Sequence, residues 1–478
     1  AAGGTPFPLP FTRNAPKKNT PKKGNSMSVT MEKGKIIGWL VTILTSIAIM
    51  LIPVSETFTP EIRAYLMLSI CVISIVAFDL MDVIIPSVLL PVAYYIFHVV
   101  PIQTAYAPFT TDTFWMILGA FVLTNALDEC GILKRIAYWI IKTCGGTYNR
   151  TLYALYLVGL ILGIITFCGH YLLLISLAYG ICRAMGFGKS KESLLIMMVG
   201  GIAGLNVKLF AYRPSTMSMM VTQVKTIDPG FSVSFLDQML YNSPSVLMAV
   251  SFIWLLTKIY KSHTFVLPGG KQYFEEEYRN LGPMSPAEKK AAVLLAILMI
   301  WISTEPLHGI SANYSFMTLP WLCFVPGINI GTRKSINQIN LGVIFFVAAC
   351  LGIGIVGTKL GFTQLLAGKI AENISGIGVN CFLFLMLFLS TLVNLILSPG
   401  AMMAVLPAPF ASLSLQLGMN PLPSLLTIIY STDFVFLPHE VPAYLIMFGF
   451  GLMTMKDFIK LHLMKIAWFT LLFGLIQI

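Results

Sequence analysis

Apolar runs long enough to cross a lipid bilayer recur along this chain from Lys35 to Ile478. Lipid offers no partner to a backbone N–H or C=O group, so each run has to satisfy its own backbone groups by forming a helix. Of the 478 residues, 56% are hydrophobic and 11% are charged, which leaves too little polar surface to cover a soluble globule. The sequence therefore predicts an all-α polytopic membrane protein.

The apolar runs divide into about eleven spanning segments and two longer stretches. The spans are expected at 36–53, 61–79, 84–100, 112–143, 192–222, 242–261, 289–304, 314–327, 341–371, 422–449 and 458–478. The stretches 150–186 and 378–415 are too long for one crossing, and "TFCGH" and "SPGA" interrupt them near the middle. Proline removes a backbone donor and glycine admits unusual backbone angles, so the second stretch should break at 398–400. Each stretch is expected to be a re-entrant hairpin.

The same order of elements occurs twice. A long helix (112–143, then 341–371) precedes a hairpin, and a spanning segment interrupted by Gly or Pro follows it. Paired interrupted segments in two halves indicate an inverted-repeat secondary transporter with its site near the midplane, where half-helix N-termini offer N–H groups to an anion. The expected domains are a basic tail, disordered or left from expression (1–34), a first half (35–262) with its broken helix at 192–222, a cytoplasmic linker (263–288), and a second half (289–478) with its broken helix at 422–449.

The formal net charge of +11 lies mostly in the first 35 residues and in short loops. A cytoplasmic N-terminus and an external C-terminus place the loop charges on the cytoplasmic side, as the positive-inside rule requires. These charges orient the chain in a bacterial inner or plasma membrane, and no nucleic-acid partner is expected. The eight cysteines show no CxxC spacing, so neither a cofactor nor a zinc site is indicated.

Three stretches resemble the divalent anion/sodium symporter (DASS) family: "AYAPFTTDTFWMILGAFVLTNALDECGILKRIAYWI", "FLPHEVPAYLIMFGFGLMTMKDFIK" and "SPGAMMAVLPAP". The resemblance implies a homodimer whose protomers each have a scaffold domain and a mobile transport domain. The transport domain would carry a dicarboxylate, citrate or sulfate across the lipid bilayer like an elevator.

The sequence departs from this family at its most characteristic positions. Each hairpin tip of the family carries Ser-Asn-Thr, which contacts substrate and sodium. The matching residues here are Thr166, Phe167 and Cys168 in one register, or Cys168, Gly169 and His170 in another, and then Ser398, Pro399 and Gly400. The family has Pro-Pro-Asn in the second broken helix, where this chain has Pro442, Ala443 and Tyr444. The residues that match the corresponding motif of the first broken helix lie near Arg213, Pro214 and Ser215.

The candidate site combines the two hairpin tips with the two helix breaks. The expected substrate-binding residues are Thr166, Cys168, Gly169, His170, Lys208, Ser398, Pro399, Gly400, Ala401 and Pro442. The expected coupling-ion or proton residues are Gly200, Gly204, Asn206, His439 and Glu440, with a sodium ion near Ser398 and Pro438 as the one metal considered. The two tips are expected to flank one cavity.

Four side chains leave more than one interpretation open. An ammonium group in mid-membrane costs at least about 2.5 kcal/mol, so Lys208 either faces an anion, replaces a sodium ion, or snorkels to an interface. His439 and Glu440 either take up a proton or bond to freed backbone groups. His170 either touches substrate or satisfies local backbone.

The function expected from these features is secondary active transport of small anions, di- or tricarboxylates, by an elevator mechanism. Proton coupling or exchange is favoured over sodium coupling, because the tips lack the family's Asn side chains and the breaks have gained charged residues. The alternatives are a conventional sodium-coupled dicarboxylate or sulfate symporter and, with less support, an anion channel. An enzyme is not expected, because the polar residues are scattered and no phosphate loop or HExxH motif is present.

Overall fold

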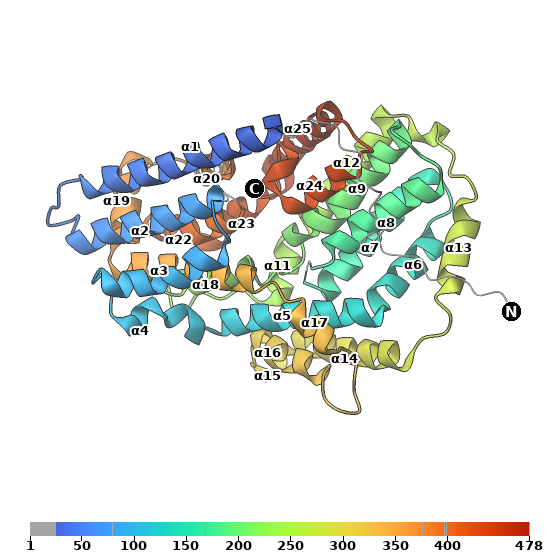
Figure 1. Ribbon diagram of the computed structural model, residues 1–478, viewed down its shortest axis with the longest axis horizontal. Coiled ribbons are helices and arrows are strands. Elements are labelled where there is room, and N and C mark those ends of the chain that lie inside the picture. The colour runs from blue at the N-terminus through green and yellow to red at the C-terminus, as the bar shows by residue number, and fades with distance from the viewer. Residues whose placement is uncertain are drawn as a thin grey trace.

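The structure is a computed structural model, and every element in the part of the chain that it describes is a helix (Figure 1). The all-α class expected from the sequence is therefore confirmed. The backbone is described for residues 25–78, 80–167, 169–374, 376–395, 397 and 399–477. The side chains are described for the same residues apart from 25–34, 306, 370–374, 439, 442 and 476–477.

The elements of the first part of the chain include the first hairpin and the first broken helix. They are α1 (Asn25–Met50), α2 (Pro60–Ala77), α3 (Ile84–Ile96), α4 (Ile102–Ala105), η1 (Ala107–Thr110), α5 (Asp112–Cys130), α6 (Ile132–Cys144), α7 (Tyr148–Ile165), α8 (Tyr171–Ala184), α9 (Lys191–Leu205), η2 (Asn206–Leu209), α10 (Met217–Val224), α11 (Phe235–Tyr241) and α12 (Pro244–Ile259).

The remaining elements include the second hairpin and the second broken helix. They are η3 (Ser262–Thr264), α13 (Gly270–Asn280), α14 (Pro286–Ser303), α15 (Glu305–His308), α16 (Ala312–Leu322), α17 (Arg333–Asn337), α18 (Leu341–Lys359), α19 (Phe362–Ile374), α20 (Val379–Asn394), α21 (Pro399–Val405), α22 (Pro407–Gln416), α23 (Pro421–Ser431), η4 (Pro438–Glu440), α24 (Pro442–Gly449), α25 (Met455–Leu472) and the π-helical turn η5 (Phe473–Gln477).

Helix α1 begins at Asn25, so residues 25–34 of the expected tail are helical. Among the described helices, five are long and apolar enough to cross a membrane unbroken, and two bent pairs raise that number to seven. Several of the other expected spans are shorter apolar helices, including Ile84–Ile96 and Pro421–Ser431. The difference arises because breaks divide many of the apolar runs into pieces.

Both of the long helices expected before the hairpins are in fact two helices. Helices α5 and α6 meet at an angle of 67°. Gly131 joins them with a φ of +87°, and Gly361 adopts a φ of +75° between α18 and α19. Side chains with a Cβ atom resist these angles, so glycine sets each break. The parallel positions of the two glycines fit the repeat inferred from the sequence.

The two hairpins and the two broken helices form at the expected places. Helices α7 and α8 are the arms of the first hairpin, and α9, η2 and α10 form the broken helix after it. In the second half, α20 ends at Asn394 and α21 begins at Pro399, so the helix breaks a few residues before the expected 398–400, and Pro399 and Gly400 start the next helix. The broken helix that follows consists of α23, a non-helical segment, η4 and α24.

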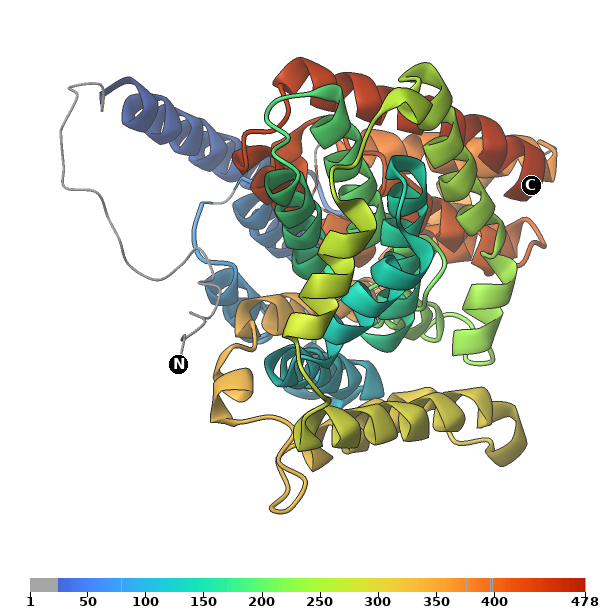
Figure 2. The same ribbon diagram turned by 90° about the vertical axis from the view of Figure 1, so that its right-hand side faces the viewer.

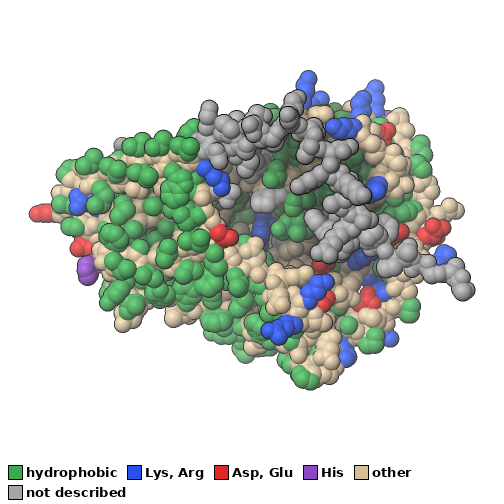
Figure 3. Space-filling model, in the orientation of Figure 1, with side chains coloured by type: hydrophobic (Ala, Val, Ile, Leu, Met, Phe, Trp, Pro, Cys, Tyr) green, Lys and Arg blue, Asp and Glu red, His purple; other side chains and the backbone are tan. Residues whose placement is uncertain are grey.

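The helices are arranged along an elongated molecule. Helices α1, α2, α3 and α19 lie at one end, and α6 to α9 lie at the other beside α13 (Figure 1). Helix α14 lies along one edge, outside the bulk of the molecule (Figure 2). Hydrophobic side chains cover most of the face over α1 to α3 (Figure 3). Exposed apolar side chains such as Leu44, Leu51 and Leu89 on this end fit a surface in contact with lipid.

A buried ion pair joins α6 to the linker between the two halves. Nε of Arg135 lies 2.6 Å from Oε1 of Glu288, and Nη2 lies 3.1 Å from Oε2. The same guanidinium group donates to the backbone oxygens of Gly282 and Leu281 at 2.9 and 3.2 Å. Both side chains are buried. This bidentate clamp fixes the start of α14.

We expect Arg135→Ala to lower the free energy of unfolding by about 3 kcal/mol, because it leaves a buried carboxylate without its partner. Lys134→Ala is the matched control, because Lys134 is an exposed neighbour on the same helix. Burial opposes the charge of Glu288, but the hydrogen bonds from Arg135 and from Ser285 outweigh it and hold the pKa of Glu288 below its ordinary value. Stability from a lowered pKa is complete above the unfolded value of about 4.3 and is lost as the pH falls through the folded value.

Thermal unfolding in detergent from pH 7 to pH 3 measures both effects. The gap between wild type and Arg135→Ala should be widest at pH 7 and should narrow as Glu288 takes up a proton. Equal losses in Arg135→Ala and Lys134→Ala, or a gap that does not change with pH, would contradict the assignment of a buried clamp.

Candidate substrate and coupling site

The two helix breaks meet inside the protein. Nδ2 of Asn206, at the first break, donates to Oδ2 of Asp433 at 2.7 Å. Nζ of Lys208 donates to the backbone oxygen of Thr432 at 3.0 Å. Helix α23 ends at Ser431, so these acceptors lie just beyond its C-terminus. The sequence located each break, whereas the structure shows that the two breaks are bound to each other.

A second lysine reaches the same place from α25. Nζ of Lys465 lies 2.9 Å from Oδ2 of Asp433 and donates to the backbone oxygen of Asp433 at 3.2 Å. The exposed fractions of the two side chains are 0% for Lys465 and 2% for Asp433. Sequence reasoning missed both residues. The signal that could have found them is an isolated charge within an apolar run, in "STDFVF" and in "LHLMKIAW".

The second hairpin is also attached to this crossing. Nδ2 of Asn394, the last residue of α20, donates to the backbone oxygens of Ser431 and Phe434 at 3.1 and 2.8 Å. Nε2 of Gln223, in α10 of the first half, donates to the backbone oxygen of Met403 in α21 at 2.6 Å. The first half of the repeat therefore donates hydrogen bonds to the hairpin and the broken helix of the second half.

The first hairpin tip is attached to α9 through His170. The imidazole is 2% exposed. Its Nδ1 lies 3.0 Å from the hydroxyl of Thr166, and its Nε2 lies 3.3 Å from the backbone oxygen of Ala203. The Thr166 hydroxyl also donates to the backbone oxygen of Leu162 at 2.8 Å. These contacts match the alternative that His170 satisfies local backbone, and its contact with substrate stays a prediction.

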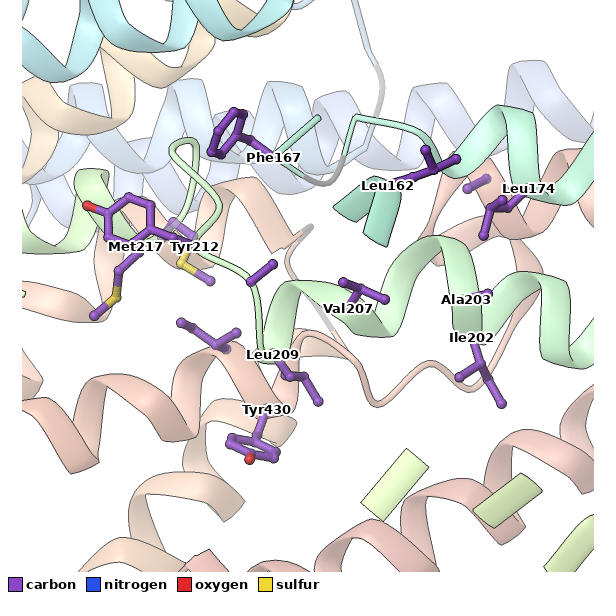
Figure 4. Close-up of a cluster of buried hydrophobic side chains, with 14 of the residues drawn as sticks. Leu162, Phe167, Leu174, Ile202, Ala203, Val207, Leu209, Tyr212, Met217 and Tyr430 are labelled. Atoms are coloured by element: carbon purple, nitrogen blue, oxygen red, sulfur yellow. The ribbon is translucent and has the colours of Figure 1, made fainter. Parts of the chain in front are cut away.

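Aromatic packing holds the tip in place. Phe167 has a φ of +52°, which is unusual for a side chain of this size. Its ring lies 4.1 Å from that of Phe316 and 5.5 Å from that of Phe235, centroid to centroid, both edge to face. Figure 4 shows the segment after Val207 between the tip at Phe167 and Tyr430 of α23. An apolar shell thus surrounds the polar crossing.

The tip of the second hairpin is closely packed as well. A side chain at Gly400 would approach the ring of Phe346 to 2.6 Å, so only glycine fits there without movement. Sγ of Cys350 donates to the backbone oxygen of Gly400 at 3.7 Å. Ala401 is fully buried. Cys168 and Ser398 lie outside the described residues, as do the side chains of His439 and Pro442.

Other predicted residues have structural contacts that the sequence did not reveal. The carboxylate of Glu440 accepts hydrogen bonds from the backbone nitrogens of Leu437 at 2.7 Å and Phe436 at 3.2 Å. This is the bonding to freed backbone that the sequence left open for Glu440. Gly200 and Gly204 allow α8 to approach α9, since added Cβ atoms would lie 2.5 Å from Cβ of Ala178 and 3.1 Å from Cα of Tyr171.

The clefts seen on the described surface lie away from the hairpin tips. One, of about 630 Å³, lies between the segment 228–241 and the segment 415–422. Another, of about 650 Å³, is lined by Lys142 and by residues of α13. The cavity expected between the two tips therefore stays a prediction. The hydrogen bonds above nevertheless connect the first hairpin to α9, the second hairpin to α10 and to the second break, and the two breaks to each other.

A comparison of the whole sequence with known families agrees with this arrangement of hairpins and broken helices. The model of the sodium:sulfate symporter transmembrane region matches residues 33–477. The chain belongs to this family. The family is one of membrane transporters, so the chain is an integral membrane transporter and the family resemblance inferred from the three sequence stretches is confirmed.

Relatives found by sequence comparison share little identity with this member of the sodium:sulfate symporter family. The sodium-dependent dicarboxylate transporter SdcS of Staphylococcus saprophyticus is 23% identical over 407 residues, which cover 78% of this chain and 76% of SdcS. A membrane protein of Cupriavidus necator is 24% identical over 302 residues, 61% of this chain and 58% of that protein. This chain therefore matches less than two thirds of the Cupriavidus necator protein.

Two solved structures share the fold. The YdaH transporter of Alcanivorax borkumensis aligns with a TM-score of 0.56 at 16% identity and covers 78% of this chain and 85% of its own. MtrF of Neisseria gonorrhoeae, described as one of a class of antimetabolite efflux pumps, aligns with a TM-score of 0.55 at 13% identity, covering 94% of this chain and 97% of its own. At these identities the likeness shows the fold alone.

We expect Asn394→Ala to lower the free energy of unfolding by about 2 kcal/mol, because two buried backbone oxygens lose a donor. Asn380→Ala is the matched control, since Asn380 is exposed on the same helix. Thermal unfolding of the purified variants measures the difference. Equal melting temperatures for the two variants would show that Asn394 does not attach the hairpin to the second break.

Proposed function

We propose that this transporter carries small anions, di- or tricarboxylates, by an elevator movement driven by exchange or protons in preference to sodium. The observation that supports this proposal is the buried crossing of the two breaks, where the ammonium group of Lys208 donates to the backbone oxygen of Thr432 and that of Lys465 pairs with the carboxylate of Asp433. Two positive charges against one negative leave an excess of one. Arg213 and Glu440, farther along the breaks, add one charge of each sign and leave the excess unchanged.

An anion bound beside this crossing would compensate the excess charge. A buried charge without compensation is costly, and the cost is greatest when the site moves through an apolar layer. The loaded transport domain would therefore cross more readily than the empty one. This difference favours exchange of one anion for another over net uptake.

Conventional sodium symport is the second candidate, because the family is named for sodium and sulfate and SdcS is named as sodium-dependent. Sodium prefers several oxygen ligands, and fixed ammonium groups near the breaks oppose its binding. The sequence also suggests coupling to protons, which His439 and Glu440 would take up. The backbone bonds of Glu440 make its carboxylate less free to act in that way.

We also propose that the transporter is a homodimer in a bacterial inner or plasma membrane, with its N-terminus in the cytoplasm and its C-terminus outside. The distribution of loop lysines and arginines supports the orientation. The family resemblance supports the dimer and the division into scaffold and transport domains. The substrate-binding residues proposed are those of the two hairpin tips together with Lys208.

We expect Lys208→Ala to weaken substrate affinity at least tenfold while the yield of folded protein changes little, because the substitution removes a positive charge from the crossing. Lys191→Ala is the matched control, since Lys191 is an exposed lysine on α9. The measurement is the concentration dependence of uptake into proteoliposomes. Lys208→Arg should recover part of the affinity. Equal affinities for wild type and Lys208→Ala would remove Lys208 from the site.

The coupling is tested by uptake into proteoliposomes under three conditions: an imposed sodium gradient at constant pH, a pH gradient without sodium, and internal substrate without either gradient. We expect internal substrate to stimulate uptake most strongly, and a sodium gradient to have little effect. Steep sodium dependence without a response to pH or to internal substrate would favour the conventional symporter. Conductance that does not saturate would indicate a channel.

A further inference from the structure

The position of the Lys465 ammonium group has the chemistry of a site for a monovalent cation. Two oxygen atoms of Asp433 bind it, Oδ2 and the backbone oxygen, and the hydroxyl of Tyr444 lies beside it. Asp433 lies two residues beyond the end of α23, and the C-terminus of a helix carries partial negative charge. A carboxylate, backbone oxygens and a helix C-terminus together attract a cation.

The protein supplies this cation itself, as the ammonium group of Lys465. Lys465 is completely buried, and an ammonium group at such a position is retained only when oxygen atoms compensate its charge. The carboxylate of Asp433 is equally dependent on its donors, Lys465 and Asn206. Removal of the ammonium group alone would leave a buried carboxylate beside a vacated space the length of a lysine side chain.

The same face of α25 carries a second buried polar side chain, that of His462. His462 lies three residues before Lys465, on the same face of the helix, and is 1% exposed. Its Nδ1 lies 3.0 Å from the backbone oxygen of Phe458 and so carries the proton. Its Nε2 then carries a lone pair, and this atom is buried without a hydrogen-bond partner.

We propose that the ammonium group of Lys465 is a resident cation at the crossing of the two helix breaks, and that its removal opens a sodium site centred on Asp433. The inference rests on the proposed function and deepens it. It names the group that makes a sodium ion unnecessary at the second break. The ligands of the opened site are the carboxylate and backbone oxygens of Asp433.

The experiment measures binding and needs no transport. Wild type, Asp433→Asn, Lys465→Ala and Lys465→Ala/Asp433→Asn are unfolded thermally in sodium chloride and in choline chloride at equal ionic strength and constant pH. We expect Lys465→Ala alone to gain a sodium-specific rise in melting temperature beyond that of wild type, of about 2 °C when sodium reaches ten times its dissociation constant. The rise should grow with the logarithm of the sodium concentration and should be absent from the double variant, which lacks the carboxylate.

Three outcomes would overturn the inference. Lys465→Ala could show no more sodium-specific stabilisation than wild type. Wild type could show a sodium-specific rise that Asp433→Asn abolishes, which would mean that a cation binds beside Lys465 already. Lys465→Ala could also fail to fold in either salt, which would mean that sodium cannot replace the ammonium group. Folding of Lys465→Ala only when sodium is present during purification would support the inference.

The same variants separate this inference from the proposed function. If wild type fails to exchange anions, the proposed function is wrong. The melting temperature of Lys465→Ala in sodium still decides whether this variant binds sodium. If wild type exchanges anions without sodium and Lys465→Ala shows no sodium binding, the function stands and the resident cation is rejected. Sodium-dependent uptake gained by Lys465→Ala would support both.

Discussion

The carboxylate of Asp433 is the group on which the centre of this transporter depends. It accepts a hydrogen bond from Asn206 and forms an ion pair with Lys465, so one buried anion connects the first helix break, the second helix break and α25. Broken helices leave backbone groups without partners, and in an apolar surrounding those groups need donors or cations from elsewhere in the protein. The crossing supplies them through Asn206, Lys208, Lys465 and Asn394, each bound to the segment just after α23 or to its end.

The same constraint explains why the hairpin tips are packed as they are. The tip at Thr166 and His170 reaches the backbone of α9, and the arm that ends at Asn394 reaches the end of α23, so each tip satisfies part of a broken helix. Aromatic side chains such as Phe167 and Phe346 fill the space around the tips. Lys208 and Lys465 place two ammonium groups beside the segment that follows α23, close to this packing.

The architecture could be predicted from the sequence because each of its signals is local. A long apolar run indicates a helix in lipid, and Pro399 or a glycine run indicates where that helix ends, without knowledge of any distant contact. Both hairpins and both broken helices were placed in this way. The breaks at Gly131 and Gly361 were missed, because a single glycine in an apolar run is compatible with a continuous helix until the packing of its two sides is known.

The partners within the site could not be predicted in this way. Lys208 was recognised because a charge within an apolar run is conspicuous, but Asp433 and Lys465 acquire their meaning only as a pair, and 32 residues separate them along the chain. Glu440 and His170 looked equally able to bind ligand or backbone, and only the positions of Leu437 and Ala203 show which backbone groups they reach. The sequence by itself determined that this chain is a helical membrane protein with two interrupted repeats, because hydropathy and backbone breaks act within one segment. The tertiary structure alone decided which charges neutralise one another, because an ion pair depends on distances between segments that the sequence does not contain.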